Sequence, residues 1–369
     1  MNRLFRWDQM GLFLLALAAG ILPFAVPEVC AAALREGLTL CSGPLLLSLF
    51  PFLVVSRLLI QCPESDLLAL PFRLAAWGIG IRTPCAARVL CIGFLGGFAP
   101  AASAAAQAVR TGQLTAEEAD ALLPACICSG PSFVVLTVGQ SLLGSAELGV
   151  LLFASQITAN YLTAALLNRF AGVRSVKPGS AAPAFPAPPR LDEILADAAI
   201  TYCKLCGFIL FFRLLAAGAG ALLPTGAGTL CAILLEVCSG CDLASRTGRW
   251  GSLLCCAALS VQGLSVLLQV RTICPPEMTL RPLYRARMLH LPLSLALFYL
   301  LLPGGEADVF STLPARVLLM RRVPPDCALL VFAVCCMAAC TLRSGIRQVE
   351  QKQMARNAGG CCINSKTLL

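Results

Sequence analysis

The sequence has little charge and almost no histidine. Asp, Glu, Lys and Arg make up only 13% of its 369 residues, about half of the ~25% found in soluble domains. Because a soluble domain needs a charged shell around its core, this composition excludes an ordinary soluble enzyme, a disordered chain and a small secreted disulfide scaffold. The only histidine, His290, precedes an apolar run, so we expect it to have a structural role.

Catalytic motifs are missing as well. The sequence contains no phosphate-binding Walker A loop, no HExxH metalloprotease motif and no GxSxG nucleophile elbow, the patterns that mark these chemistries in a chain. A single histidine gives no support for a Ser-His-Asp triad or a histidine-rich metal centre. We therefore expect no enzyme activity, no cofactor and no metal.

Apolar residues dominate instead. They make up 58% of the chain, and the mean hydropathy is +0.82, which indicates a polytopic membrane protein. The 21 cysteines lie mostly within apolar runs, where cysteine acts as a small hydrophobe. Two CxxC pairs, Cys203/Cys206 and Cys238/Cys241, lack the histidines and polar surroundings of a zinc site.

Long uncharged stretches predict the spans of an all-α polytopic membrane protein. Several approach the ~20 residues that a helix needs to cross a bilayer. The first also resembles a signal peptide, because Arg3 and Arg6 precede it, but its length favours an uncleaved span. A shorter mixed segment, 67–81, predicts an interfacial helix. The apolar segments are residues 10–29, 41–56, 89–109, 121–146, 148–168, 205–235, 250–270, 288–305 and 327–342.

The basic residues set the orientation of these segments. With a cytoplasmic N-terminus, most of the 28 Lys and Arg face the cytoplasm, provided that two segments enter and leave the membrane on one side. The first is 89–109, and the second lies between the Gly/Pro-rich turn at 218–228 and Arg246. Treating both as full spans would put the basic stretch 169–190 outside. We therefore expect re-entrant segments on opposite faces and cytoplasmic N- and C-termini.

A proline-rich stretch divides the chain into two halves of similar build. Residues 172–190 carry five prolines among alanine and serine, a composition typical of an extended linker. We expect an N-terminal membrane half at 1–171, a cytoplasmic linker at 172–190, a C-terminal membrane half at 191–344 and a basic cytoplasmic tail at 345–369.

Short matches relate the two halves. Arg57 and Arg213 follow similar apolar runs, residues 96–97 match 239–240, and residues 128–133 match 261–266. The order of segments and their charges then predict an inverted-topology repeat with re-entrant and broken helices, which is typical of secondary transporters. The alternative is chance, because small residues are common wherever membrane helices pack closely.

Two polar patches interrupt the apolar segments, at 126–133 and 259–269. Non-helical backbone is tolerated in a membrane only where it is buried in protein or lines a cavity, and a helix break exposes N–H groups that suit an anion. Alternatively, these polar side chains only hold helices together. The candidate substrate-binding residues are Ser129, Gly130, Pro131, Ser132, Gln262, Gly263, Ser265, Gln269, Gly97 and Ser103.

One acidic residue, Glu236, lies within an apolar segment. An intramembrane carboxylate costs at least ~2.5 kcal/mol and points to function. We expect it to bind a coupling proton or sodium ion. The alternative is a structural ion pair with Arg213 or Arg246.

Motifs in both halves resemble the nucleoside-recognition, or Gate, domain family. Their order and spacing over residues 48–302 are similar to the YlbJ-type sporulation integral membrane proteins (the stage V sporulation protein V type), and the motif at 262–266 is the most specific. The motifs are Gly97-Phe98, 110–115 (RTGQLT), 117–119 (EEA), 129–133 (SGPSF), 138–139 (VG), 235–237 (LEV), 239–240 (SG), 262–266 (QGLSV) and 269–270 (QV).

The resemblance implies a multi-pass transporter of a small anionic solute. Members move dipicolinate from the mother cell into the developing spore across the outer forespore membrane. Ser103 stands where the family has a lysine, so a cationic contact to the substrate is missing at residue 103. The Asn-rich break that precedes the proline in the family is reduced here to residues 126–130 (CICSG). Two alternatives stay open: a nucleoside or other small-solute transporter of the same fold, and a non-transporting structural membrane protein of spore envelope assembly. The expected partners are the small solute, a coupling proton or sodium ion and the lipid bilayer. We expect no nucleic-acid partner.

Overall fold

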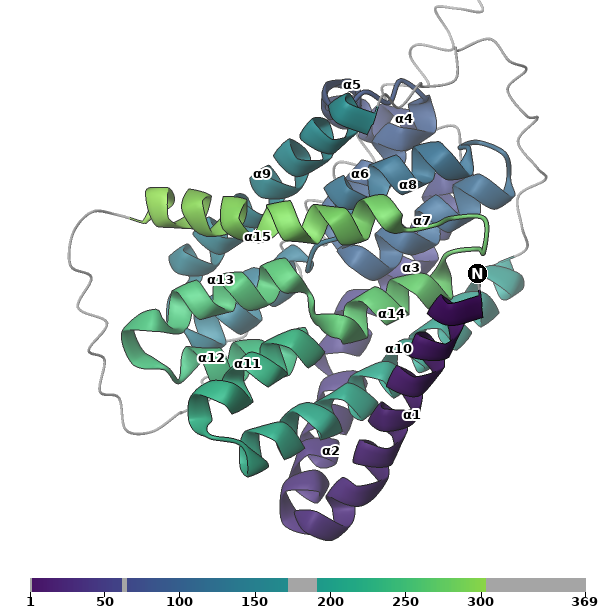
Figure 1. Cartoon of the computed structure of the whole chain (residues 1–369). Coiled ribbons are helices and arrows are strands. Elements are labelled where there is room, and N and C mark those ends of the chain that lie inside the picture. The colour runs from purple at the N-terminus through teal and green to yellow at the C-terminus, as the bar shows by residue number, and fades with distance from the viewer. Residues whose placement is uncertain (1, 62–64, 172–190, 303–369) are drawn as a thin grey trace, which may run out of the picture.

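The computed structural model describes residues 2–61, 65–171 and 191–302, and over these ranges the chain forms helices and turns without strands (Figure 1). The all-α prediction is therefore confirmed for this part of the chain. The predicted linker at 172–190, the span at 327–342 and the tail at 345–369 lie outside the described residues.

Several helical segments are long and apolar enough to cross a membrane. They are residues 146–170 in α9 (Ala146–Ala171), residues 191–222, which form α10 (Leu191–Leu222), and residues 248–273. A fourth candidate is the pair α1 (Asn2–Ala25) and α2 (Pro27–Ser42), which bends by 113°. The chain thus has the helices of an integral membrane protein.

The bend between α1 and α2 corrects the first predicted span. That span was expected to run to residue 29, but α1 ends at Ala25 and Pro27 begins α2. Proline has no N–H to continue a helix, and it fits the first turn of a new one.

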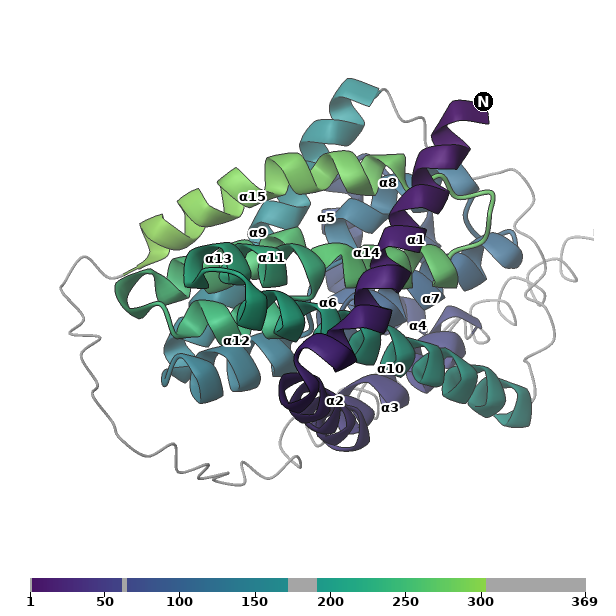
Figure 2. The same cartoon turned by 60° about the horizontal axis from the view of Figure 1, so that its bottom comes forward.

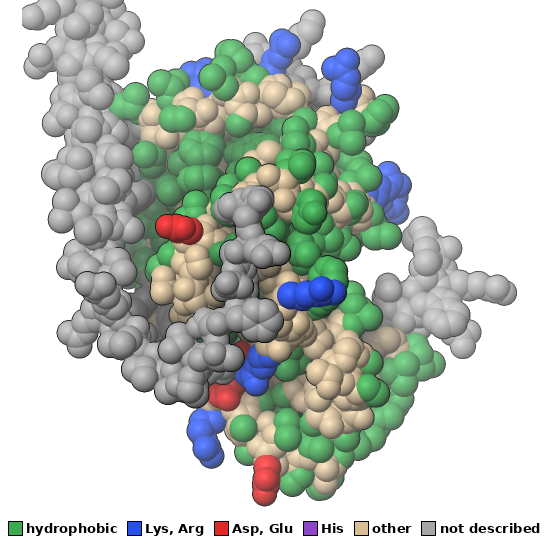
Figure 3. All heavy atoms as spheres, turned by 90° about the vertical axis from the view of Figure 1, so that its left-hand side faces the viewer, with side chains coloured by type: hydrophobic (Ala, Val, Ile, Leu, Met, Phe, Trp, Pro, Cys, Tyr) green, Lys and Arg blue, Asp and Glu red, His purple; other side chains and the backbone are tan. Residues whose placement is uncertain are grey.

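The surface is largely apolar, as a lipid-facing protein requires. Large hydrophobic side chains stand out from it, among them Phe24, Phe170 and Leu300, each more than three-quarters exposed. In Figure 3 hydrophobic side chains cover much of the face that lies at the left of Figure 1, with a few charged side chains among them. Apolar exposure on this scale marks a membrane or partner surface.

A short helical hairpin lies in each of the two segments that were predicted to be re-entrant. In the first half α6 (Pro84–Gly96) reverses at Gly97 into α7 (Phe98–Arg110), and a Cβ added at Gly93 would lie 3.2 Å from the Cβ of Ala101. In a continuous helix, residues two turns apart are separated by ~10 Å, so this contact requires the chain to fold back.

The hairpin of the second half has the same construction. Helix α11 (Thr225–Leu235) reverses at Glu236 into α12 (Val237–Ser245). A Cβ added at Gly240 would lie 2.8 Å from the Cα of Ile233. The two helices lie side by side in Figure 1.

A broken helix follows each hairpin. Helix α8 (Ala116–Cys126) stops before the π-helix η1 (Ser132–Leu142), and α13 (Gly251–Val261) is separated from α14 (Gly263–Ile273) by Gln262 alone. Gln262 has a φ of 65°, a left-handed conformation that cannot continue a right-handed helix. Both predicted polar patches therefore coincide with helix breaks.

The remaining helices enclose these elements. Helix α3 (Pro44–Gln61) packs on α7, and α15 (Arg281–Leu301) packs along α9 and joins the halves. Helices α1, α2 and α10 contact one another and form the lower part of Figure 1, which comes forward in Figure 2. The shorter elements are α4 (Ser65–Leu68), α5 (Leu70–Gly78), where an interfacial helix was predicted, and the 3-10 turn η2 (Gly248–Trp250).

Candidate functional site

In each half the tip of the hairpin touches the break of the following helix. A Cβ added at Gly97 would lie 2.7 Å from the backbone nitrogen of Gly130, and one added at Gly263 would lie 2.9 Å from the backbone nitrogen of Glu236. Both glycines also have positive φ, +82° and +69°. Only glycine allows this backbone conformation and this close approach together.

These contacts define which residues correspond between the halves. Gly130 corresponds to Gly263, as the sequence match predicts, and Gly97 corresponds to Glu236, because each lies at its hairpin tip. The predicted match of 96–97 with 239–240 is therefore wrong. It was based on glycines, but the tip of the second hairpin carries a carboxylate in place of a glycine.

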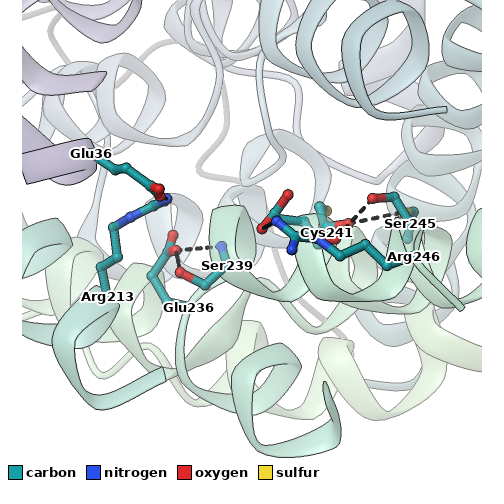
Figure 4. A network of polar contacts seen from close by, with 9 residues as sticks. Glu36, Arg213, Glu236, Ser239, Cys241, Ser245 and Arg246 are labelled. Atoms are coloured by element: carbon teal, nitrogen blue, oxygen red, sulfur yellow. Dashed lines mark hydrogen bonds and ion pairs between the residues drawn. The ribbon is translucent and has the colours of Figure 1, made fainter. Parts of the chain in front are cut away.

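Glu236 is buried and caps the start of α12 (Figure 4). Its Oε1 accepts a hydrogen bond from the backbone N–H of Cys238 at 2.8 Å, and its Oε2 accepts from the N–H of Ser239 at 2.7 Å and from Ser239 Oγ at 2.9 Å. A carboxylate is favoured here because the partial positive end of the helix faces it. Backbone donors thus supply much of the stabilisation that its burial requires.

Neither arginine that the sequence offered as a partner pairs with Glu236. The Arg213 guanidinium forms an ion pair with Glu36 at 2.7 Å (Figure 4). Arg246, the C-cap of α12, forms an ion pair with Asp242 of the same helix at 2.6 Å. The structural ion-pair alternative for Glu236 is thus not what the structure contains.

A side-chain hydrogen bond connects the two helix breaks. Gln262 Nε2 donates to Ser129 Oγ at 3.3 Å and to the carbonyl of Leu259 at 2.7 Å. In α14, Gln269 Nε2 donates to Ser265 Oγ at 2.8 Å. The Oε1 atoms of both glutamines are buried without a hydrogen-bond partner, which leaves two acceptors close to the breaks.

A cavity of about 60 Å³, which we call the central cavity, lies where the tips and breaks meet. Five of the predicted residues line it, and they come from both halves: Ser129, Gly130, Ser132, Glu236 and Gln269. Its apolar wall includes Phe98, Phe133 and Val266. The other predicted residues, Gly97, Pro131, Gln262, Gly263 and Ser265, lie in the surrounding tip and breaks.

Ser103 does not belong to this cavity. It lies farther along α7, in a separate cavity of about 180 Å³. That cavity is also lined by Arg57, Arg110 and Lys204. Ser103 thus lies apart from the helix breaks, because α7 carries it away from the hairpin tip, and its role in substrate binding stays a prediction.

Sequence reasoning missed a buried arginine between the two broken helices. Arg287 in α15 is 8% exposed, and its guanidinium donates to the carbonyl of Ile127 and, at 3.3 Å, to the carbonyl of Ser260. The Ile127 carbonyl lies at the C-terminal end of α8, and the Ser260 carbonyl lies at the C-terminal end of α13. The partial negative charge of a helix is greatest at this end. Arg287 therefore joins the C-terminal ends of two half-helices, one from each half.

The predicted apolar segment 288–305 begins just after Arg287, whereas α15 begins at Arg281, so the structure places Arg287 within the helix. The available signal was its spacing. Arg287, His290 and Ser294 recur at the helical period, and all three are buried. His290 contacts the carbonyl of Gln156 through Nε2 at 3.2 Å, so this polar face packs against α9.

Comparison of the chain with models of known protein families, with curated proteins and with solved structures gives no match. Among the described residues, no group of three or more His, Cys, Asp or Glu could hold a metal ion. The fold and site therefore define the class by themselves: a helical chain with membrane-length helices, in which two hairpin tips and two helix breaks surround a cavity.

Proposed function

We propose that this chain is an integral membrane transporter of a small anionic solute. The observation that carries the proposal is the meeting of two hairpin tips and two helix breaks around a cavity lined by Ser129, Ser132, Glu236 and Gln269. Discontinuous helices near the membrane midplane, contributed by two repeats, are typical of secondary transporters. They are tolerated there because their irregular backbone lines a cavity or is buried in protein.

We further propose that the halves are inverted-topology repeats. The first half consists of α3, the hairpin α6–α7, the broken helix α8–η1 and α9. The second half consists of α10, the hairpin α11–α12, the broken helix α13–α14 and α15. In this arrangement the first hairpin enters from the cytoplasm and the second from the opposite face. The distribution of Lys and Arg supports it, because it keeps residues 169–190 in the cytoplasm.

The uncapped helix starts support an anionic solute. Helices α7 and α14 and the π-helix η1 begin at the tip or the breaks without a side-chain cap, whereas α12 is capped by Glu236. Free N–H groups at a helix start attract carboxylates, and Glu236 already illustrates this at one tip. By resemblance to the YlbJ-type family, the solute would be dipicolinate, exported toward the forespore, with Glu236 binding the coupling proton or sodium ion.

The lining also supports a second candidate, a nucleoside or another neutral solute of the same fold. Among the described residues that line the cavity, Glu236 is the only charged one, and it is an acid. Hydroxyl-rich solutes bind well to carboxylate, serine and glutamine side chains. An anion would have to depend on backbone donors to offset this negative charge.

Uptake by vesicles containing the purified protein tests these candidates. We expect labelled dipicolinate to accumulate when a proton or sodium gradient is imposed, and uridine to be excluded. Ser132→Leu, which fills the cavity wall, is expected to lower uptake by at least tenfold. Ser141→Leu, near the other end of the same helix and outside the cavity, is the matched control. Uridine uptake would favour the second candidate, and uptake of neither solute by folded protein would favour a structural membrane protein.

The inverted topology predicts on which side each hairpin begins. In a cysteine-depleted background, Glu117→Cys after the first hairpin and Glu193→Cys in α10 should react with an impermeant thiol reagent from the cytoplasmic side. Arg249→Cys after the second hairpin and Thr225→Cys at its start should react only from the other side. Labelling of Glu117→Cys and Arg249→Cys from one side would contradict the inversion.

A further inference from the structure

The cavity that contains Ser103 is unusually basic. It lies between α3, α7, α10 and α14, and Arg57, Arg110 and Lys204 line it together with a single acid, Asp197. The hydroxyl side chains of Ser103, Thr201 and Thr272 complete its polar wall. Cations from three different helices thus converge on one space, which we call the cationic pocket.

Its positive charge is only partly compensated. Arg57 Nη1 lies 2.6 Å from Asp197 Oδ2. Arg110 makes one long hydrogen bond, 3.4 Å, to the carbonyl of Ile273, and within the described part of the chain neither Arg110 nor Lys204 forms an ion pair. The Nε of Arg57 is buried without a hydrogen-bond partner. The lining therefore carries an excess of two positive charges, which a concave pocket focuses on its interior.

The cationic pocket adjoins the central cavity along three helices. On α10, Phe208 lines the pocket and Ile209 lines the cavity. On α14, Thr272 lies less than one turn beyond Gln269, and on α7, Ser103 lies between one and two turns beyond Phe98. The pocket and the cavity border one packed apolar cluster, to which Leu205 of the pocket and Leu49 and Phe98 of the cavity belong.

We propose that the cationic pocket binds a small dianion, a dicarboxylate or a phosphate, and holds it at the cytoplasmic entrance of the central cavity. The binding follows from the charge of the pocket, whereas the role as an entrance rests on the proposed transport function. Such a site raises the local concentration of anions. It also supplies the cationic contact that the cavity between the helix breaks does not have.

Calorimetric titration of the detergent-solubilised protein tests the binding. The probes are dipicolinate and inorganic phosphate, with neutral picolinamide as the control ligand. Lys204→Gln and Arg110→Gln should each weaken dianion binding about tenfold, because each removes one charged contact. Arg249→Gln, an exposed cation elsewhere in the chain, is the matched control. Raising the salt concentration should weaken binding to the wild-type protein.

The outcomes separate this pocket from the transport proposal. Dianion binding that is unchanged in the Lys204→Gln, Arg110→Gln double variant would overturn the pocket, even if the protein transports. Binding that depends on both residues, in a protein that transports nothing, would retain the pocket and overturn the proposed function. An anionic lipid headgroup carries the same chemistry, so phosphatidylglycerol is titrated in parallel. Binding of the lipid but of neither soluble dianion would also overturn the assignment.

Discussion

Replacing Glu236 by glutamine is expected to abolish gradient-driven uptake while solute binding persists. The substitution removes the only charge among the described residues that line the central cavity, so no group at the tip of the second hairpin would bind a coupling proton or sodium ion. The fold should survive, because a glutamine oxygen still accepts one of the N–H groups that now bind the carboxylate. Vesicle uptake with and without an imposed gradient measures the effect.

Two further variants separate coupling from helix capping. Ser239→Ala removes one hydrogen bond to Glu236 but keeps its charge, so coupled uptake should persist with a loss of stability of about 1 kcal/mol. Glu277→Gln neutralises an exposed acid in the loop before α15 and should change nothing. Wild-type coupling in Glu236→Gln would remove the residue from the mechanism. Equal loss of coupling in Ser239→Ala would show that Glu236 acts only as a cap.

The helix breaks could be predicted because their causes are local. Proline and glycine at 130–131 disfavour a helix, and a glycine at 263 permits the left-handed conformation. Apolar length likewise predicts membrane helices, because the bilayer thickness sets the number of residues. Such signals fix where an element ends, but they do not say which distant element lies beside it.

The errors concern contacts between distant segments. The predicted correspondence of the hairpins failed because Glu236 replaces a glycine at the second tip, and only the contact with Gly263 reveals the equivalence. Ser103 was placed with the breaks because sequence order cannot show that α3 and α10 surround it with cations. Arg287 looked like a loop residue because a charge near an apolar run usually faces water.

The connection through Arg287 suggests how the halves are held together. Its guanidinium contacts carbonyls at the ends of α8 and α13, and the hydrogen bond between Gln262 and Ser129 joins the same two breaks. A buried arginine without an acidic partner is costly, but two helix C-termini offer it partial negative charge and acceptors. Two side chains thus connect the breaks, Arg287 from α15 and Gln262 between α13 and α14.

Replacing Arg287 by methionine is therefore expected to destabilise the protein strongly. Methionine keeps the approximate length of the side chain but leaves the carbonyl of Ser260 without this donor, and that of Ile127 with only the long 3.4 Å hydrogen bond from Asn160 Nδ2. Buried acceptors that lose charged donors cost about 2–4 kcal/mol in all, and the unfolding midpoint in detergent should fall by at least ~5 °C. Arg285→Met, an exposed position on the same helix, should leave the midpoint unchanged. Arg287→Lys keeps the charge but cannot reach both carbonyls with a planar fork, so its loss should be intermediate. A methionine variant as stable as wild type would mean that the desolvation cost of the buried charge balances its hydrogen bonds, and that packing alone aligns the two breaks.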